Sequence, residues 1–324
     1  MITAGILCLF VSCSKDSSST SIKQAEHPAF CSDSAYAFIE AQMAFGPRVP
    51  NSEAHMQCAV WLIEQLRAYG AEVELQKGFM TDYRGHDQQI YNIIGHFSMQ
   101  HIASRPRLLL GAHYDTRPWC DEEPIHANRL YNVPGANDGA SGVGVLLEVA
   151  RQIGCRIADS TLYTPVDIVF FDVEDMGAPS FYTGMERSDT WCLGSQLWAK
   201  NYSSDPSGVN YRFGIILDMI GDPKAVFPKE YYSTHYAESY QQQIWRSAEQ
   251  LGYGSLFSQQ SSYPIVDDHY YINSMAGVPC VDIIHYDARN RTGFPSWWHT
   301  RQDDMQNISK QTLQAVGEVV MNLL

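Results

Sequence analysis

Apolar residues recur along the chain in two spacings, one helical and one of short continuous runs rich in β-branched and aromatic side chains. The helical spacing predicts amphipathic helices, and the short runs predict buried strands. The helices expected from the spacing cover residues 34–45, 51–70, 143–153, 194–202, 236–251 and 308–324, with a short helix opening at 265–269. The strands expected from the runs cover residues 71–79, 89–97, 107–111, 167–171, 211–219 and 281–284.

Strands that alternate with helices indicate a largely parallel sheet with helices on both faces. We therefore expect an α/β fold, a three-layer α/β/α sandwich around a mixed, mostly parallel central sheet. The length of 324 residues permits one large domain or two. Because the chain shows no internal repeat and no change of composition after residue 28, we expect one catalytic domain over residues 29–324.

Two polar residues stand where helices are expected to begin. Asn51 can cap the helix that ends at Gly70. Asp138 lies just before the amino end of the helix at 143–153. A role as N-cap, worth about 1 kcal/mol, is therefore one interpretation of Asp138, beside the functional one developed below.

The first 28 residues are expected to lie outside the fold. Residues 2–11 form an apolar run that is too short to span a bilayer and is typical of a secretory signal. The sequence FVSC, which ends at Cys13, resembles a bacterial lipobox, and the resemblance implies lipidation of that cysteine. We expect a signal or lipobox segment at 1–13, a Ser-rich tether at 14–28, and an exported protein, periplasmic or anchored to the membrane.

The charge balance excludes several kinds of partner. The chain has 22 basic and 36 acidic residues, a formal net charge of −14, and no basic cluster. Nucleic acid and anionic membranes are therefore not expected as partners, whereas surplus carboxylates fit a protein that gathers acids around a cation. Six cysteines follow Cys13, none in a CxxC pair, so a zinc–thiolate site is not expected, and the pairing of any disulfides stays open.

The segment 165–177 organises the chain, because a buried strand ends there in acids. The apolar run 167–171 is followed within four residues by Asp172, Glu174 and Asp175. In open α/β sheets, ligands and chemistry lie at the carboxyl ends of the strands. An isolated run of this kind is more often a strand that leads into a solvated acidic turn, so the interpretation depends on the other strands.

Acids and histidines recur at the ends of the other expected strands and at helix starts. With the two acids after 167–171, they are His113, Asp138, Glu174, Asp175, Asp218, Asp267 and His299. Such ends converge at one edge of the sheet. Carboxylates gathered there would repel one another without a cation, and carboxylate with imidazole suits a zinc ion that keeps an open position for catalysis. Each residue alone is more often a cap, a surface acid or a core histidine.

The motifs GAHYDT, GANDGASGV, FFDVED, LDMIGD and WHTRQDD, in this order, resemble those of the zinc-dependent aminopeptidase superfamily. Within it they are most similar to the glutaminyl cyclases (glutaminyl-peptide cyclotransferases), over about residues 108–304. Two segments favour the cyclases. The segment 266–269 carries a doubled acid, and the segment 294–300 carries an aromatic pattern with Trp before His, whereas peptidases usually have a lone Asp and no such Trp.

The resemblance implies a role for each matching residue. The implied ligands of one zinc ion are Asp138, Asp175 and His299. The implied general acid/base is Glu174, and the acids that hold its proton network are Asp218 and Asp267. The implied walls of the substrate pocket are Trp298 and Phe294, with Trp191 as a further candidate. Asp175 stands where the cyclases usually have Glu, which shortens the ligand arm by one C–C bond, about 1.5 Å.

The implied activity is cyclisation of the N-terminal glutamine of a peptide or protein to pyroglutamate, with loss of ammonia, by a monomeric enzyme. Zinc would act as Lewis acid on the side-chain amide, and Glu174 would carry the proton of the α-amine to the departing ammonia. Repulsion from Asp218 and Asp267 is expected to raise the pKa of Glu174.

Two other functions stay open. The first is an exported two-zinc aminopeptidase in which Glu174 activates water. The sequence retains all the side chains that form the second metal site of such peptidases, namely His113, Asp138 and Asp218. The second is a lipid-anchored peptide-binding protein on an inactive scaffold, and the intact Glu174 argues against it.

Overall fold

The computed structural model describes residues 29–324, except for 186 and 205–207. The expected signal or lipobox segment and the expected Ser-rich tether lie outside these described residues. Among the described helices, none has the length and apolar character needed to cross a membrane.

Six strands form a mixed central sheet in the order β1-β2-β4-β3-β5-β8. They are β1 (Glu72–Thr81), β2 (Asp87–Phe97), β3 (Arg107–His113), β4 (Val166–Phe171), β5 (Tyr211–Asp218) and β8 (Cys280–Ile284). The pairings β4–β3, β3–β5 and β5–β8 are parallel, and β1–β2 and β2–β4 are antiparallel. The predicted mixed, mostly parallel sheet is confirmed.

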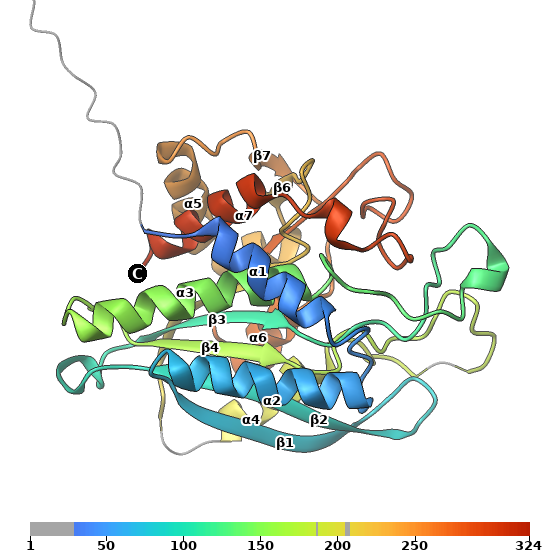
Figure 1. Ribbon diagram of the computed structural model, residues 1–324, viewed down its shortest axis with the longest axis horizontal. Helices are drawn as coiled ribbons and strands as arrows, with labels where there is room; N and C mark the ends of the chain where they lie inside the picture. Colours follow the sequence, from blue (N-terminus) through green and yellow to red (C-terminus); the bar gives the residue numbers. More distant parts are fainter. Residues whose placement is uncertain (1–28, 186, 205–207) are drawn as a thin grey trace, which may run out of the picture.

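Helices cover both faces of this sheet (Figure 1). One face carries α1 (Ser32–Met43), α2 (Glu53–Ala68), α3 (Ala140–Ala158) and α7 (Lys310–Met321). The other face carries α4 (Leu193–Ser204) and α6 (Asp268–Ala276), while α5 (Tyr231–Gln250) packs on β8 at the edge. The short 3₁₀ helices are η1 (Gln100–Ile102), η2 (His126–Asn128) and η3 (Met305–Asn307).

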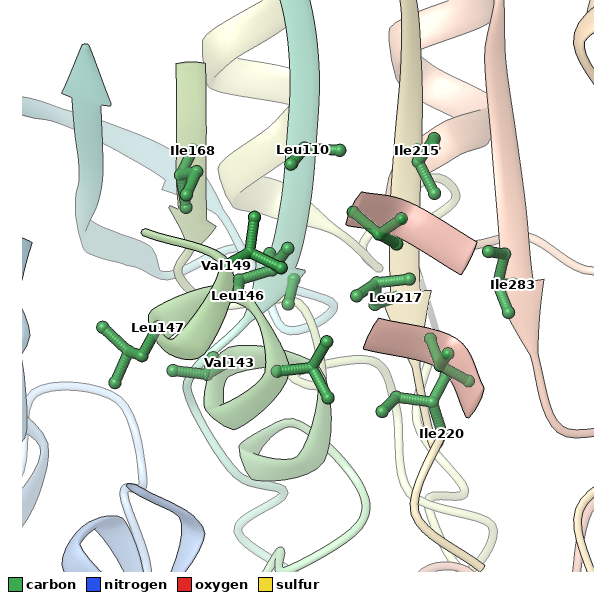
Figure 2. Close-up of a cluster of buried hydrophobic side chains, with 14 of the residues drawn as sticks. Leu110, Val143, Leu146, Leu147, Val149, Ile168, Ile215, Leu217, Ile220 and Ile283 are labelled. Atoms are coloured by element: carbon green, nitrogen blue, oxygen red, sulfur yellow. The ribbon is translucent and has the colours of Figure 1, made fainter. Parts of the chain in front are cut away.

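The main core lies between α3 and the sheet, as Figure 2 shows for Leu146 of α3 and Leu110 of β3. Leu108 shares the cluster with Leu110, whereas Leu109 belongs to the cluster under α4 and α6. This alternation follows from the two-residue period of a strand. A parallel strand covered by helices on both faces is therefore apolar at every position, which explains the continuous runs in the sequence.

A close approach places the first turn of α3 against the end of β5. A Cβ atom added to Gly142 would lie 2.2 Å from the backbone oxygen of Leu217 near the end of β5. Only glycine allows this contact without a shift of the backbone. The contact brings Asp138, just before α3, to the carboxyl end of β5.

The structure corrects two of the expected helix caps. Gly139, with φ of 89°, precedes α3, and no side chain caps that helix, so the interpretation of Asp138 as N-cap is wrong. The N-cap of α2 is Ser52, whose side chain accepts from the backbone N–H of His55 at 3.2 Å. Asn51 instead adopts a positive φ of 65°, so its predicted capping role is also wrong.

Three further features differ from the predictions made from the sequence or add to them. Helix α5 begins at Tyr231 rather than near residue 236, because the Glu230 side chain caps it. The sequence did not predict the small sheet of β6 (Phe227–Lys229) and β7 (Phe257–Ser261). All six cysteines of the described residues are free.

Candidate active site

A cavity of about 450 Å³ opens at the carboxyl edge of the sheet. All nine site residues expected from the sequence line it: Asp138, Glu174, Asp175, Trp191, Asp218, Asp267, Phe294, Trp298 and His299. They come from the loops that follow β3, β4 and β8, from the last residue of β5 and from the start of α6. The parallel strands therefore bring together residues that are far apart in the sequence.

The three expected zinc ligands form one buried group. The Nε2 atom of His299 lies 3.2 Å from Oδ1 of Asp175 and 3.6 Å from Oδ2 of Asp138. Oδ2 of Asp138 and Oδ2 of Asp175 are buried and have no hydrogen-bond partner. Two unpaired carboxylate oxygens beside an imidazole nitrogen are a donor set that suits zinc, so these residues fit the ion.

A buried arginine and a buried aspartate, which the sequence analysis missed, hold two of these ligands. Oδ1 of Asp121 lies 3.3 Å from Nδ1 of His299, the arrangement that commonly orients a metal-binding histidine. Arg117 donates to both oxygens of Asp121, at 2.7 and 2.8 Å, and to Oδ1 of Asp175 at 3.2 Å. Burial opposes ionisation of Asp121, but Arg117 and His299 outweigh it and hold its pKa well below the usual range.

The turn after β4 presents Glu174 to the cavity. Asp115 accepts from the backbone N–H of Glu174 at 3.0 Å and from that of Asp175 at 3.3 Å. The residue before Glu174, Val173, has a positive φ of 55°, which is strained for a β-branched side chain. Asp115 lies in the motif GAHYDT, which was the available signal for its importance.

The surroundings of Glu174 favour its neutral form. Burial raises the pKa of Glu174 well above its usual value, and repulsion from Asp175, Asp267 and Asp268 adds to this effect. The thiol of Cys192 donates to Oε1 of Glu174 at 3.2 Å. The repulsion by Asp267 was expected from the sequence, whereas the repulsion by Asp175 and Asp268 was not.

His113 does not line the cavity, but it contacts two of the lining acids. Its Nε2 atom lies 3.0 Å from Oδ1 of Asp138 and 3.4 Å from Oδ1 of Asp218. Burial opposes the charged form of His113, but the nearby carboxylates of Asp115, Asp138 and Asp218 outweigh it and raise its pKa well above the usual value. Burial also raises the pKa of Asp218 to about 7. These residues form a second potential metal group that shares Asp138 with the first.

Aromatic rings wall the cavity beside His299. Trp298 stacks on the imidazole with ring centroids 3.5 Å apart, and Phe294 contacts Trp298 at 4.6 Å. Trp191 lies parallel to the imidazole at 6.4 Å. The ring of Trp191 rests on Gly177, where an added Cβ would lie 1.9 Å from it. The structure thus brings Trp191 to the site although a long loop separates it from β4.

A further missed residue supports the segment of Asp138. The carboxylate of Asp303 accepts from the backbone N–H of Asn137 at 2.8 Å and from that of Asp138 at 3.1 Å. Its position inside WHTRQDD was the only signal in the sequence. Asp172, by contrast, does not line the cavity and bonds to the ring of His55 at 2.7 Å and the backbone N–H of Tyr91 at 2.8 Å.

The mixed sheet lies between two layers of helices and gathers acids and histidines at its carboxyl edge. This fold and site are those of a zinc exopeptidase-like α/β enzyme. The chain belongs to peptidase family M28, whose sequence profile matches residues 92–324.

The chain is also similar in sequence to individual proteins of known name, and for two of them in structure. The chain is 46% identical to the glutaminyl cyclase of Tannerella forsythia, with a TM-score of 0.84, over 91% of this chain and 98% of that one. It is 43% identical to a Zn-dependent exopeptidase from Parabacteroides distasonis, with a TM-score of 0.85, over 92% of this chain and 99% of that one. It is 28% identical to aminopeptidase YwaD of Bacillus subtilis, over 72% of this chain and 44% of that protein. The chain thus matches less than half of YwaD.

Proposed function

We propose that this enzyme is a zinc-dependent glutaminyl-peptide cyclotransferase, which converts the N-terminal glutamine of peptides or proteins to pyroglutamate and releases ammonia. The observation that carries the proposal is the aromatic wall of Trp298, Phe294 and Trp191 in the same cavity as Glu174. A hydrolase must admit water, whereas cyclisation requires that water be kept from the amide. The 46% identity to a glutaminyl cyclase supports the same activity.

In this proposal Asp138, Asp175 and His299 hold one zinc ion, with Arg117 and Asp121 fixing the orientation of two of these ligands. The ion supplies a Lewis acid that polarises the side-chain amide of the substrate. The substrate's own α-amine is the nucleophile, so the chain must accept its proton and return a proton to the leaving ammonia.

Glu174 is the group placed for both proton transfers. It adjoins the ligand Asp175, and its buried position, with acids nearby, raises its pKa toward the range in which a carboxylate both accepts and returns a proton near neutral pH. Cys192 contacts one oxygen of Glu174, which leaves the other to act on the substrate. Asp218 and Asp267 are proposed to hold the proton network around Glu174.

A two-zinc aminopeptidase is the second candidate, and one observation favours it. His113, Asp138 and Asp218 form a further group of potential ligands that shares Asp138 with the first. A shared carboxylate is typical of sites in which two metal ions lie about 3.5–4 Å apart. In that enzyme Glu174 would activate a water molecule rather than accept a proton from an amine.

Product analysis separates these activities. We expect the zinc-loaded enzyme to convert a glutaminyl dipeptide to a product lighter by one ammonia, detected by mass spectrometry. An alanyl dipeptide should stay unchanged, and so should the glutaminyl dipeptide with a Glu174→Gln variant. Release of free glutamine or alanine without any pyroglutamate would identify an aminopeptidase and contradict the proposal.

The location and assembly are also proposed. Residues 1–13 are proposed to direct export from a bacterial cell, with lipidation at Cys13 as anchor and residues 14–28 as tether. Residues 29–324 are proposed to act as one catalytic domain and as a monomer in the periplasm or at the membrane.

A further inference from the structure

A second cluster of buried titratable groups adjoins Asp267, and the proposed mechanism uses none of its other members. Glu230 caps α5, His269 lies in the first turn of α6, and Asp282 lies in the middle of β8. Each of these three side chains is 0% exposed. Three separate elements therefore place ionisable groups in the core beside the active site.

His269 joins Glu230 to Asp282. Its Nε2 atom lies 2.9 Å from Oε2 of Glu230, and its Nδ1 atom lies 3.4 Å from Oδ2 of Asp282. Glu230 also accepts from the backbone N–H of Ser233 at 2.6 Å and of Ile265 at 3.1 Å. Burial opposes ionisation of Glu230, but the bond with His269 outweighs it and lowers its pKa. Glu230 is thus an ionised acceptor, and the Nε2 atom of His269 donates to it.

Asp282 has no such donors. Neither of its carboxyl oxygens has a hydrogen-bond partner, and Oδ2 of Asp267 is unpaired as well. Potential ligand atoms of Asp267, His269 and Asp282 lie within 4.8 Å of one another. Burial raises the pKa of Asp282 well above its usual value, and the neighbouring acids add to this shift. The charged and titratable groups around Asp282 come from α5, α6, the segment before α6, and β5, and they are Glu230, His269, Asp268, Asp267 and Asp218.

We propose that Asp282 is held as a neutral carboxylic acid that shares its proton with Asp267, and that Glu230, His269 and Asp282 form a positioning unit for the acid beside Glu174. Two carboxyl groups that are close and shielded from water share a proton rather than both ionise. The Nδ1 atom of His269 faces one oxygen of Asp282 at 3.4 Å, and the proposal assigns the other oxygen to Asp267. Asp267 in turn groups with Glu174, since their oxygens lie within 4.8 Å.

A bound cation would be another way to neutralise this cluster, but the surroundings favour a proton. The group offers one atom from each of three residues, whereas calcium and magnesium take six or more oxygen ligands. Asp282 and His269 are themselves both 0% exposed, so no water-sized space adjoins them from which bound water could complete a coordination shell. A second metal ion is therefore one of the outcomes that the experiment must exclude.

The protonation of Asp282 can be tested without any assay of activity. Denaturant unfolding of the zinc-loaded enzyme is compared with that of Asp282→Asn, from about pH 5 to about pH 8. The neutral Asn side chain imitates the protonated acid at every pH, whereas wild-type Asp282 must take up a proton on folding. Because the folded-state pKa is raised, the wild type loses stability as pH rises, and its unfolding constant should increase about tenfold per pH unit relative to the variant.

Asp82→Asn provides the matched control. Asp82 lies in the turn between β1 and β2 and is 0% exposed, but it accepts from two side-chain nitrogens of Arg84, at 2.8 and 3.1 Å, and from Gln88 at 3.0 Å. Burial raises its pKa, but the bonds from Arg84 outweigh this and lower it. Since Asp82 is then ionised in both states above about pH 5, and the side chains of Arg84 and Gln88 do not titrate in this range, the control should lose stability by an amount independent of pH.

The positioning role rests on the proposed cyclase function and is tested separately. Asp282→Asn retains a donor and should keep kcat within about threefold, whereas Asp282→Leu removes it and should lower kcat at least tenfold with KM little changed. Both variants should retain the zinc content of the wild type. If no cyclase activity exists, the proposed function fails, while the pH dependence of unfolding still tests the protonation.

Three results would overturn the inference. They are a ratio of unfolding constants that does not change with pH, a second equivalent of metal that is lost in Asp282→Asn, and equal kcat values for the Asn and Leu variants. Should Asp282→Asn not fold, infrared spectroscopy of the wild type gives the answer. The carbonyl band of protonated carboxylic acids should persist at about pH 8, and its absence would rule out a neutral Asp282.

Discussion

Oδ1 of Asp121 lies 3.3 Å from Nδ1 of His299, so a carboxylate that no sequence motif indicated orients one of the proposed zinc ligands. The same carboxylate accepts two hydrogen bonds from Arg117, which also reaches Oδ1 of Asp175. One buried pair therefore holds two proposed ligands. As the proposed ligand, Asp175 has a shorter side chain than the Glu that the cyclases usually carry, and the bond from Arg117 fixes the position of its carboxylate.

Asp121→Asn is expected to weaken zinc binding by about 10–100-fold, because His299 loses the acceptor that fixes its ring. Competition with a fluorescent chelator measures the affinity. Glu122→Gln is the control, since Glu122 is the next residue and pairs with the exposed Arg291 at 3.0 Å. Equal zinc affinities for the wild type and Asp121→Asn would show that Asp121 does not orient the ligand.

Metal analysis of the purified enzyme is expected to give one zinc ion per chain. His299→Ala should lose it, because a site with an open position has only three protein ligands. His113→Gln should retain it, since His113 belongs only to the second potential group. Two zinc ions in the wild type, one of them lost in His113→Gln, would instead support the two-zinc aminopeptidase.

Gly177→Ala is expected to lower activity on glutaminyl peptides while zinc content stays unchanged. An added Cβ would lie 1.9 Å from the ring of Trp191, so the ring must leave its place beside His299. Gly254→Ala is the matched control, because its nearest neighbours lie 3.9 Å away, an ordinary contact. The activity of both variants on a glutaminyl dipeptide is measured. If Gly177→Ala is as active as Gly254→Ala, Trp191 does not form part of the substrate pocket.

The N-terminal proposal is tested by fractionation of cells that express the full chain. The wild type is expected in the membrane fraction, and Cys13→Ser is expected to release it into the soluble fraction, because the acyl anchor requires that thiol. A wild type that is wholly soluble and retains the residues before Cys13 would show that no lipobox operates.

The sequence predicted the central strands well, for a physical reason. Strands covered on both faces must be apolar at every position, so 107–111 and 167–171 are visible without other information. The acids at their ends were visible too, because polar residues directly after such runs stand out. Their convergence then followed from the topology of a parallel sheet.

The residues that support the site could not be predicted in the same way. Arg117 and Asp121 lie in a long irregular loop, and their contacts with Asp175 and His299 span 58 residues or more along the chain. No periodic pattern marks such contacts. Asn51 and Ser52 show a smaller failure of the same kind, since both are good cap residues and only the backbone conformation decides between them.

Glu174→Gln separates chemistry from scaffold. The variant keeps the shape of the side chain but cannot accept a proton from the α-amine. Fold and zinc content should survive, because Glu174 is not among the proposed ligands. A general acid–base group typically contributes about 10²–10⁴-fold, and here one group serves two transfers. We therefore expect kcat to fall by at least this factor with KM little changed, measured with a glutaminyl dipeptide.

Asp175→Asn, one position along the chain, is the comparison for Glu174→Gln. It should weaken zinc binding, because Asn is a poorer ligand and Arg117 loses one of its two charged partners, the carboxylate at 3.2 Å. Excess zinc should partly restore the activity of Asp175→Asn but not that of Glu174→Gln. This result would assign Asp175 to zinc binding and Glu174 to proton transfer. If Glu174→Gln cyclised at nearly the wild-type rate, the base would be a different acid. Asp267, which also lines the cavity, is then the first residue to substitute.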